Sequence, residues 1–319
     1  METVEKKSWK TDVAVLLIFF ARSQCLEKVF ESIRQARPRA LLLWQDGPRQ
    51  GREDDIENIE KCRKIVENID WECTVYRKYN EKNIGCDPSI FYAYNWAFEH
   101  VDKCIFLEDD QVPSQSFYPY CKELLDRYEN DTRISHICGY NYTEVAPSCE
   151  ADYLFSPTGS GAWATWKRVV DSWRGDYSFL DNSESADFVA KKYSRLGEMV
   201  LNNAKRHRAT GKEFWESIIG CNCLFNSQLA IIPKYNLVTN VGLTANSTHS
   251  NTAMKYLPKV QRNLFEMKAY ELSFPLKHPE FVITNEDYFK RVHIIMGTGH
   301  PFRRKWRRFV YIIKRILYR

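Results

Sequence analysis

The first third of the chain alternates short apolar runs with amphipathic stretches. Residues 13–20 form an almost unbroken apolar run, which suits a strand that is buried on both faces. Residues 25–36 then place apolar side chains at helical spacing, and Pro38 prevents a helix from continuing. The next apolar run, 40–44, ends in the turn-rich segment 45–48. This order of strand, helix and strand predicts a βαβ unit.

The same alternation continues to the middle of the chain. Residues 53–69 predict a charged amphipathic helix, 73–76 a short strand, and 88–100 a helix with an aromatic face. A fourth short strand is predicted over 104–107. Repetition of this order predicts a doubly wound, mostly parallel sheet flanked by helices, in which ligands bind beyond the carboxyl ends of the strands.

After about residue 150 the pattern becomes less regular, with a polar helical stretch near 187–208 and a strand-like run over 224–232. No internal repeat or low-complexity linker divides the chain, so we expect one continuous domain over 13–285. We expect a polar N-terminal extension (1–12), a nucleotide-binding half (about 13–120), an acceptor half (about 121–285) and a basic tail (286–319).

The basic charge is concentrated at the C-terminus. The net charge is +5, but residues 303–319 hold eight of the basic side chains and no acidic one. Without them, 38 basic residues face 41 acidic ones, which argues against a nucleic-acid partner. On a helix, the apolar residues of this tail would share one side, which favours an anionic membrane surface as its partner over docking on the protein itself.

The cysteines and the N-terminus indicate a cytoplasmic protein. The ten cysteines have no CxxC spacing and are spread through the expected helices and strands, so we expect reduced, mostly buried thiols. The apolar run at 13–20 is too short for a signal peptide core or a membrane span.

Three consecutive carboxylates follow the fourth predicted strand, and we call them the acidic cluster: Glu108, Asp109 and Asp110. Like charges this close repel one another, and a divalent cation is the simplest compensation. Mg²⁺ and Mn²⁺ prefer oxygen ligands, often one or two carboxylates with substrate phosphates and water. The alternative is a solvated acidic turn without a ligand.

Two earlier strand ends carry polar residues of the kind that bind nucleotides. Arg22 follows the first strand, where its guanidinium is suited to phosphate. Asp46 follows the second, where its carboxylate is suited to a base or ribose. Taken alone, either residue fits an ordinary surface side chain better than a nucleotide ligand.

Four stretches of the first half, 20–23, 45–47, 83–96 and 107–117, resemble a bacterial family of nucleotide-diphospho-sugar transferases. That family is similar in pattern to the Golgi N-acetylglucosaminyltransferase that begins complex N-glycans. Segments of the second half resemble the same family and extend the similarity to about residue 280: 163–166, 215–216, 232–242, 247–249 and 274–279. The resemblance implies a GT-A fold, in which a Rossmann-like nucleotide half is merged with an acceptor half.

The resemblance also implies roles for the donor-side residues. Asp110 and Asp109 would hold a Mn²⁺ or Mg²⁺ ion, and Glu108 with Asp109 would help to hold the ribose and the metal's waters. Arg22, with its neighbour Ala21, would contact the nucleotide. Asp46 would contact the nucleobase.

Three residues of the second half are expected at the reaction centre. Glu216 would be the general base that removes the acceptor hydroxyl proton, with inversion at the anomeric carbon. His249 would bind a phosphate or the metal, or else be a hydrogen-bonded loop residue. Trp163 would stack on a sugar ring, or else pack in the core.

Two positions depart from the family's pattern. The family has Asp where Glu216 stands, and Ser217 comes next, so a register shift of one residue would leave no base. The glycine-rich lead into the tryptophan motif is altered over residues 159–162. The reach of the base and the shape of the sugar pocket therefore depend on the three-dimensional structure.

The sequence thus predicts a metal-dependent, inverting glycosyltransferase that uses a nucleotide sugar, with a UDP-sugar favoured by the resemblance alone. Its acceptor would be a glycan or lipid-linked hydroxyl at the inner face of a bacterial inner membrane, in cell-surface polysaccharide synthesis. One alternative is a metal-dependent sugar nucleotidyltransferase, although the glycine-rich phosphate loop usual in that class is not found. The other is a non-catalytic, membrane-docked sugar-binding protein.

Overall fold

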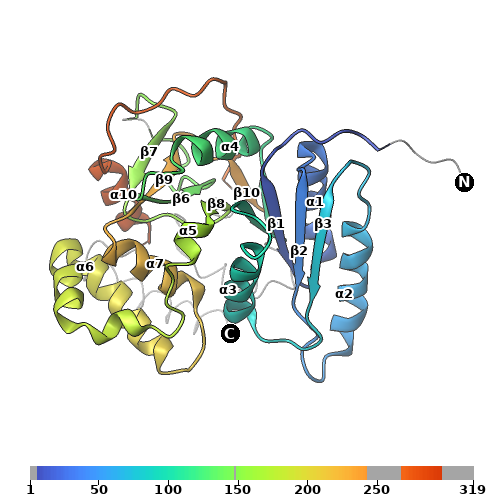
Figure 1. The fold of residues 1–319 in the computed structure, drawn as a ribbon, viewed down its shortest axis with the longest axis horizontal. Coiled ribbons are helices and arrows are strands. Elements are labelled where there is room, and N and C mark those ends of the chain that lie inside the picture. Colours follow the sequence, from blue (N-terminus) through green and yellow to red (C-terminus); the bar gives the residue numbers. More distant parts are fainter. Residues whose placement is uncertain (1–5, 147–148, 243–266, 297–319) are drawn as a thin grey trace, which may run out of the picture.

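An eight-stranded sheet runs through the whole protein (Figure 1). The computed structural model describes residues 6–146, 149–242 and 267–296. The strand order is β3-β2-β1-β4-β8-β6-β9-β7, and β7 and β8 run against the other six. The predicted fold class, a mixed and mostly parallel α/β sheet flanked by helices, is confirmed.

The first half of the chain forms four parallel strands joined by helices. Its elements, in chain order, are β1 (Ala14–Phe19), α1 (Ser23–Ala36), β2 (Ala40–Gln45), α2 (Glu53–Val66), β3 (Thr74–Tyr79), α3 (Cys86–Ala97) and β4 (Lys103–Glu108). Each agrees with a predicted element to within a few residues. The crossover from β3 to β4 reverses the strand order between β1 and β4, which creates a topological switch point.

The second half extends the same sheet and adds a small two-stranded one, in which β5 pairs with β10. Its strands are β5 (Gln111–Pro113), β6 (Ile134–Cys138), β7 (Tyr153–Ser156), β8 (Trp163–Trp166), β9 (Leu229–Pro233) and β10 (Val238–Asn240). Its helices are α4 (Phe117–Arg127), α5 (Lys167–Val170), the 3₁₀ helix η1 (Ser178–Asp181), α6 (Ser183–Arg208), α7 (Trp215–Phe225) and α10 (Glu286–Met296).

One prediction for this half is wrong. Residues 224–232 do not form a single strand, because Leu224 and Phe225 are the last residues of α7 and β9 begins only at Leu229. The polar turn between them, with Ser227 at a φ of 54°, breaks the apolar run. Apolar periodicity alone does not separate the end of a buried helix from the start of a strand.

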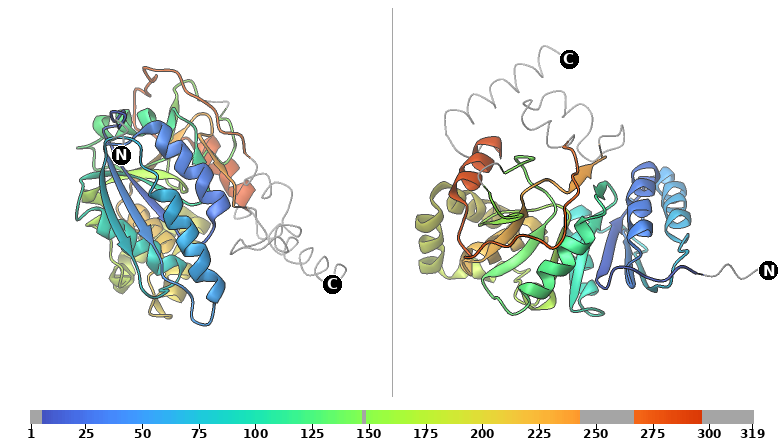
Figure 2. Two further views of the ribbon diagram at one scale, coloured as in Figure 1. Left: turned by 90° about the vertical axis from the view of Figure 1, so that its right-hand side faces the viewer. Right: turned by 90° about the horizontal axis from the view of Figure 1, so that it is seen from above.

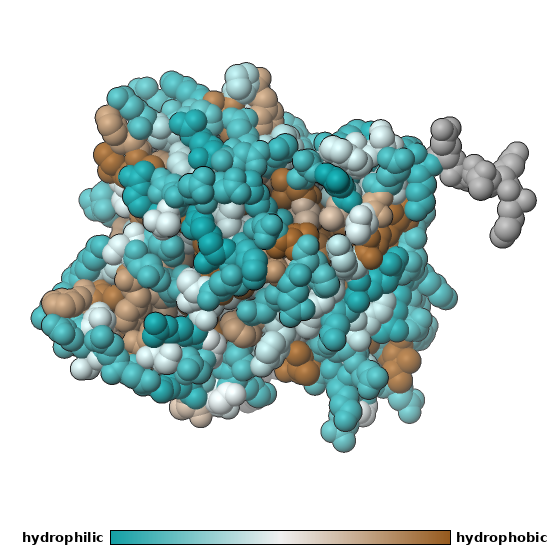
Figure 3. All heavy atoms as spheres, in the orientation of Figure 1, coloured by the Kyte–Doolittle hydropathy of each residue, from teal (hydrophilic) through white to brown (hydrophobic). Residues whose placement is uncertain are grey.

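Side chains on the two faces of the parallel strands pack into two separate cores. On β1, Val15 and Leu17 point into the core beneath α1, α2 and α4. Leu16 and Ile18 point into the opposite core, beneath α3 and α7. Every residue of β1 is buried, as the unbroken apolar run predicts. Outside, hydrophilic residues cover most of the face shown in Figure 3 and hydrophobic ones form small, separate patches.

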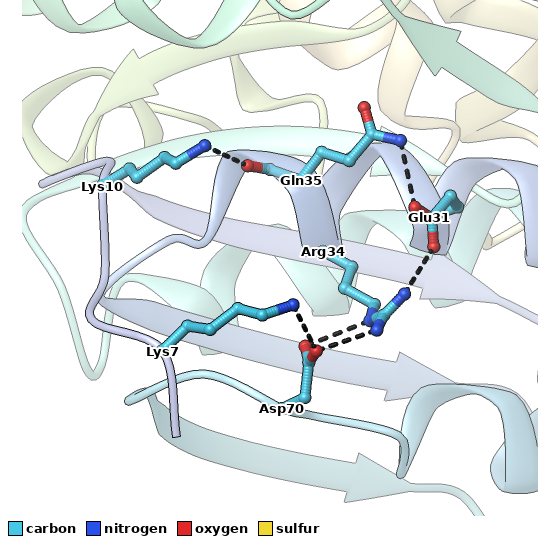
Figure 4. A network of polar contacts seen from close by, with 6 residues as sticks. All are labelled: Lys7, Lys10, Glu31, Arg34, Gln35 and Asp70. Atoms are coloured by element: carbon cyan, nitrogen blue, oxygen red, sulfur yellow. Dashed lines mark hydrogen bonds and ion pairs between the residues drawn. The ribbon is translucent and has the colours of Figure 1, made fainter. Parts of the chain in front are cut away.

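The N-terminal segment is bound to the edge of the parallel half by ion pairs. Arg34 on α1 donates two hydrogen bonds to Asp70, at 3.0 and 2.8 Å, and Lys7 contacts the same carboxylate at 3.0 Å (Figure 4). These cations lower the pKa of Asp70 to about 2. Residues 6–12 are therefore attached to the sheet through α1 and the loop before β3.

Helix α10 lies beside the far edge of the sheet, next to β7 in Figure 1, and it is the red-orange helix in both views of Figure 2. Tyr288 and Val292 are buried in a small third core, and Thr284 bridges to Phe155 of β7. The described start of the expected tail, 286–296, is thus packed on the domain. All ten cysteines are free thiols and eight are buried, which confirms that they are mostly buried.

Candidate functional site

A pocket opens at the carboxyl ends of β1, β2 and β4, at the switch point of the sheet. Its volume is about 510 Å³, within the roughly 300–1,000 Å³ range of small-molecule sites. The residues that line it come from the ends of three strands and from the helices that follow them: Ile18–Arg22, Asp46, Arg49, Arg52, Asp54, Asp55, Asn58, Asn83, Cys86, Ser89, Ile90, Glu108 and Asp109.

Five residues expected at a nucleotide site line this pocket together: Ala21, Arg22, Asp46, Glu108 and Asp109. They are far apart in the sequence and meet because parallel strands end at the same edge of the sheet. Asp110 follows at the turn between β4 and β5, where its carbonyl oxygen accepts a hydrogen bond from Val241 at 2.8 Å. The acidic cluster therefore joins the nucleotide half to the end of β10.

The guanidinium of Arg22 lies between two carboxylates of the acidic cluster. It donates to Asp110 Oδ2 at 3.0 Å and forms a close ion pair with Asp109 Oδ1. The backbone N–H of Phe20 donates to the other Asp109 oxygen at 3.3 Å. Burial alone would lower the pKa of Arg22, but these carboxylates raise it well above its usual range. Arg22 is thus a fixed positive charge at the floor of the pocket.

Glu108 is the carboxylate of the cluster that has no ion pair among the described residues. Its Oε1 accepts a hydrogen bond from Gln111 at 3.0 Å. Burial raises the pKa of Glu108 to about 8, and the negative charges of Asp110 and Asp109 contribute to the rise. A further positive charge beside Glu108 would therefore be favourable at neutral pH.

The carboxylates of the acidic cluster suit a metal ion that takes most of its ligands from a bound substrate. Within residues 6–146, 149–242 and 267–296, no three His, Cys, Asp or Glu side chains converge as a ready-made metal site. Arg22 already contacts one oxygen each of Asp109 and Asp110. A Mg²⁺ or Mn²⁺ ion would thus have one or two protein carboxylates and would take its other ligands from diphosphate and water, as Mg²⁺ commonly does.

The side chain of Asp46 organises the pocket wall. Its carboxylate accepts hydrogen bonds from the backbone N–H groups of Gly47, Ile84 and Gly85 and from the side chain of Asn80, at 3.0 to 3.2 Å. Burial raises its pKa, and these hydrogen bonds oppose the rise. Asp46 therefore holds the loop between β3 and α3 against the end of β2, and both of its oxygens are occupied by protein donors.

Several lining residues were not anticipated from the sequence. Arg49 donates to Asp55 through its side chain at 2.8 and 2.6 Å, and its guanidinium lies over the ring of Phe20 at 5.4 Å. Arg52 pairs in the same way with Asp54. Their position in the sequence could have indicated them, because both arginines follow the second strand, as Asp46 does.

Glu216 lies at the first turn of α7, with its side chain exposed. Its negative charge contributes to the raised pKa of Glu108, and also to that of Tyr142 in the loop after β6. Glu216, on the opposite half of the chain, is thus within electrostatic range of Glu108. Ser217 points elsewhere, because it is buried and hydrogen-bonded to His207 at 2.7 Å.

Trp163, another second-half candidate, does not line the pocket. Trp163 is 2% exposed on β8, where its indole N–H donates to Tyr94 at 3.1 Å and its ring packs on Phe106. This placement matches the core alternative rather than sugar stacking. His249 lies outside the described residues.

Fold and pocket together define an α/β protein with a pocket of small-molecule size at the carboxyl edge of its sheet. A search of family profiles finds no match, and no curated protein is found with a similar sequence. Among solved structures, the fold is compared with 4-diphosphocytidyl-2C-methyl-D-erythritol synthase from Anaerococcus prevotii. That match has a TM-score of 0.37 and 8% identity and covers 76% of this chain and 99% of the other.

Proposed function

We propose that this protein is an inverting glycosyltransferase that moves a sugar from a nucleotide-diphosphate donor to an acceptor hydroxyl. The observation that carries the proposal is the arrangement at the pocket floor. Arg22, Glu108 and Asp109 line a pocket at the switch point, and an exposed carboxylate of the acceptor half, Glu216, is within electrostatic range of Glu108.

The donor would bind along the ends of β1 and β2, with its diphosphate at the floor of the pocket. Arg22 would balance the phosphate charge, since a guanidinium binds phosphate oxygens well. A Mn²⁺ or Mg²⁺ ion held by Asp110 and Asp109 would stabilise the charge that develops on the leaving diphosphate. Asp46 would act through the loop that it holds.

Glu216 would take the proton from the acceptor hydroxyl as that oxygen attacks the anomeric carbon. Its position suits this role because it is exposed to solvent at a helix start and still close enough to act electrostatically on Glu108. Attack by a hydroxyl from the side opposite the leaving diphosphate gives inversion. A single general base then suffices.

The function is tested by release of nucleoside diphosphate. The full chain is incubated with Mn²⁺ and a panel of nucleotide sugars, including UDP-N-acetylglucosamine, UDP-galactose and UDP-glucose, with and without glycan acceptors. We expect nucleoside diphosphate from at least one donor. Failure across the whole panel would leave a non-catalytic sugar-binding protein, and formation of a nucleotide sugar from a nucleoside triphosphate and a sugar phosphate would indicate a nucleotidyltransferase.

Replacing the proposed base separates catalysis from binding. We expect Glu216→Gln to lower kcat by about 10²–10⁴-fold, the usual contribution of a general base, with donor Kd little changed. The matched control is Glu213→Gln, because Glu213 lies three residues earlier, in the loop before α7, where it accepts a hydrogen bond from Tyr92 at 3.0 Å. Equal kcat values for Glu216→Gln and wild type would remove Glu216 from the base role.

We also propose an anionic membrane surface as the partner of residues 303–319, which lie outside the described structure. The support is their charge, since these residues include eight basic side chains and no acidic one. No helix in the described part of the chain is both long and apolar enough to cross a membrane.

A further inference from the structure

A second cavity lies in the acceptor half, between the end of α7, the start of α6 and the loop after α5. Its volume is about 570 Å³, again within the roughly 300–1,000 Å³ range of small-molecule sites. No residue that lines it also lines the pocket at the switch point. The two cavities are therefore built from different side chains.

Three aromatic rings form the apolar part of its wall: Trp173, Phe179 and Phe225. The rings of Phe179 and Phe225 pack against each other, with their centroids 5.4 Å apart. Trp173 is fixed by the core behind it, where its ring lies 6.2 Å from Phe91 and 5.9 Å from Tyr94. Since the three lining rings are partly exposed, they offer a fixed apolar surface to a ligand.

Polar side chains of the same wall have unused hydrogen-bonding groups. The guanidinium of Arg174 is exposed and makes no hydrogen bond or ion pair with a described residue. The hydroxyl of Ser185 likewise has no partner among the described residues. Asn226 donates through Nδ2 to the carbonyl oxygen of Asn222 at 2.9 Å, and this leaves its Oδ1 as an acceptor. Donors and acceptors are thus both available to a ligand.

This combination of groups is complementary to a saccharide. Sugar hydroxyls donate and accept, as amides and hydroxyls do, and the C–H faces of a sugar ring pack on aromatic rings. Asp171 also lines the cavity, but Lys167 already pairs with its carboxylate at 2.8 Å. A phosphorylated ligand would meet only Arg174 as an unpaired cation among the described lining residues. We propose that this cavity is a saccharide-binding site.

Helix α7 connects the cavity to the proposed reaction centre. Glu216 is in its first turn and Asn226 directly follows its last residue. At a rise of 1.5 Å per residue, these positions are about 15 Å apart along the helix. A saccharide in the cavity would therefore bind away from Glu216. Its binding would need neither donor nor metal, so it goes beyond the proposed transfer reaction and is measured without turnover.

The test uses the full chain without nucleotide or Mn²⁺. The wild type is applied to a printed panel of neutral and acidic oligosaccharides, and the strongest binder is titrated by calorimetry. We expect Arg174→Ala and Ser185→Ala each to weaken binding by about ten-fold, as loss of one hydrogen bond implies. Neither side chain bonds to a described residue, so both variants should keep the wild-type melting temperature.

Two further variants are the controls. Arg291→Ala removes an exposed arginine on α10 that lines neither cavity. Glu216→Gln changes the proposed base without touching the second cavity. Both should bind the oligosaccharide with the wild-type affinity.

Three results would overturn the proposal. A wild type that binds no oligosaccharide would exclude the site, whereas the release of nucleoside diphosphate from a donor would still support the transferase function. Wild-type affinity in both Arg174→Ala and Ser185→Ala would place the ligand elsewhere on the protein. Loss of affinity in Glu216→Gln alone would place the saccharide at the proposed reaction centre.

Discussion

Carboxylates of similar chemistry have different environments within this one pocket. Asp46 is surrounded by N–H donors, Asp109 is paired with Arg22, and Glu108 has a single amide partner beside two like charges. Asp46 therefore has a structural role, whereas Glu108 is the carboxylate whose pKa should respond most to an added cation. Arg22, Asp46 and the acidic cluster could be predicted from the sequence because each directly follows a strand that forms the same sheet edge.

Other site residues could not be predicted, for a physical reason. Arg49 enters the pocket through the loop between β2 and α2, which contains Gly51 at a φ of 75°. Nothing local in the sequence indicates that Gly242 lies against Asp110, because that contact depends on packing between segments more than a hundred residues apart. Trp163 was ambiguous for the same reason, since only its neighbours distinguish a core ring from a sugar platform.

The environment of Glu108 predicts an unusual pH dependence of stability for the ligand-free protein. Glu108 titrates near pH 8 when folded and near 4.3 when unfolded, so the folded state binds more protons between these values. Stability should therefore fall as pH rises from about 4.3 through 8. Glu108→Gln should remove part of this fall, which melting temperatures across that range would measure.

The control for this measurement is Glu198→Gln, which removes one negative charge at an exposed position on α6. It should leave the slope of melting temperature against pH at the wild-type value. If Glu108→Gln also keeps the wild-type slope, Glu108 is ionised in the folded protein at neutral pH. The interpretation that the acidic cluster has too little positive charge nearby to balance its carboxylates would then be wrong.

At the scale of elements, the short β5–β10 pair connects the two halves of the site. β10 pairs with the residues just after the acidic cluster, and the turn that follows it places Gly242 against Asp110. The helices and strands of the first half were predictable because Pro38, the turn-rich segment 45–48 and apolar periodicity mark them. The β5–β10 pair was not, since each strand is three residues long and its partner lies over a hundred residues away.

Gly242 is predicted to be intolerant of any side chain. A Cβ at this position would overlap Asp110 Oδ2 and approach Asn240 Oδ1 to 3.0 Å. Gly242→Ala should therefore displace the Asp110 carboxylate and weaken metal-dependent donor binding by about ten-fold or more, the loss of roughly one charge-assisted hydrogen bond. Binding of the donor with Mn²⁺, measured by calorimetry, checks this expectation.

Gly220→Ala is the matched control, because a Cβ there on α7 would meet only Val200 Cγ1, at an ordinary 3.8 Å. Alanine also favours a helix over glycine, so this variant should be at least as stable as the wild type. Wild-type donor affinity in Gly242→Ala would show that the position of Asp110 does not matter for binding.

At the scale of the whole molecule, charge is distributed unevenly. The eight cations of 303–319 account for the net positive charge of the chain. We expect the full chain to co-sediment with vesicles that contain an anionic phospholipid and not with neutral ones. Binding should weaken as salt rises, because screening shortens the range of the attraction.

Charge reversal tests the same prediction in the complete protein. Changing Arg303, Arg304, Arg307 and Arg308 to Glu should abolish sedimentation with anionic vesicles, while the release of nucleoside diphosphate from a donor in solution is unchanged. Equal sedimentation of this variant and the wild type would show that another surface contacts the membrane. Sedimentation with neither kind of vesicle would remove the membrane from the list of partners.

The antiparallel pairing of β4 with β8 has a mechanical consequence. Four residue pairs, from Lys103 with Trp166 to Phe106 with Trp163, join the two halves within one hydrogen-bonded ladder. Separate lobes that swing about a hinge would have to break this ladder, so opening and closing of the site must come from loops at the strand ends. Because the sheet is continuous, both halves should unfold in a single cooperative transition. A substitution that destabilises one half should therefore destabilise the other half as well.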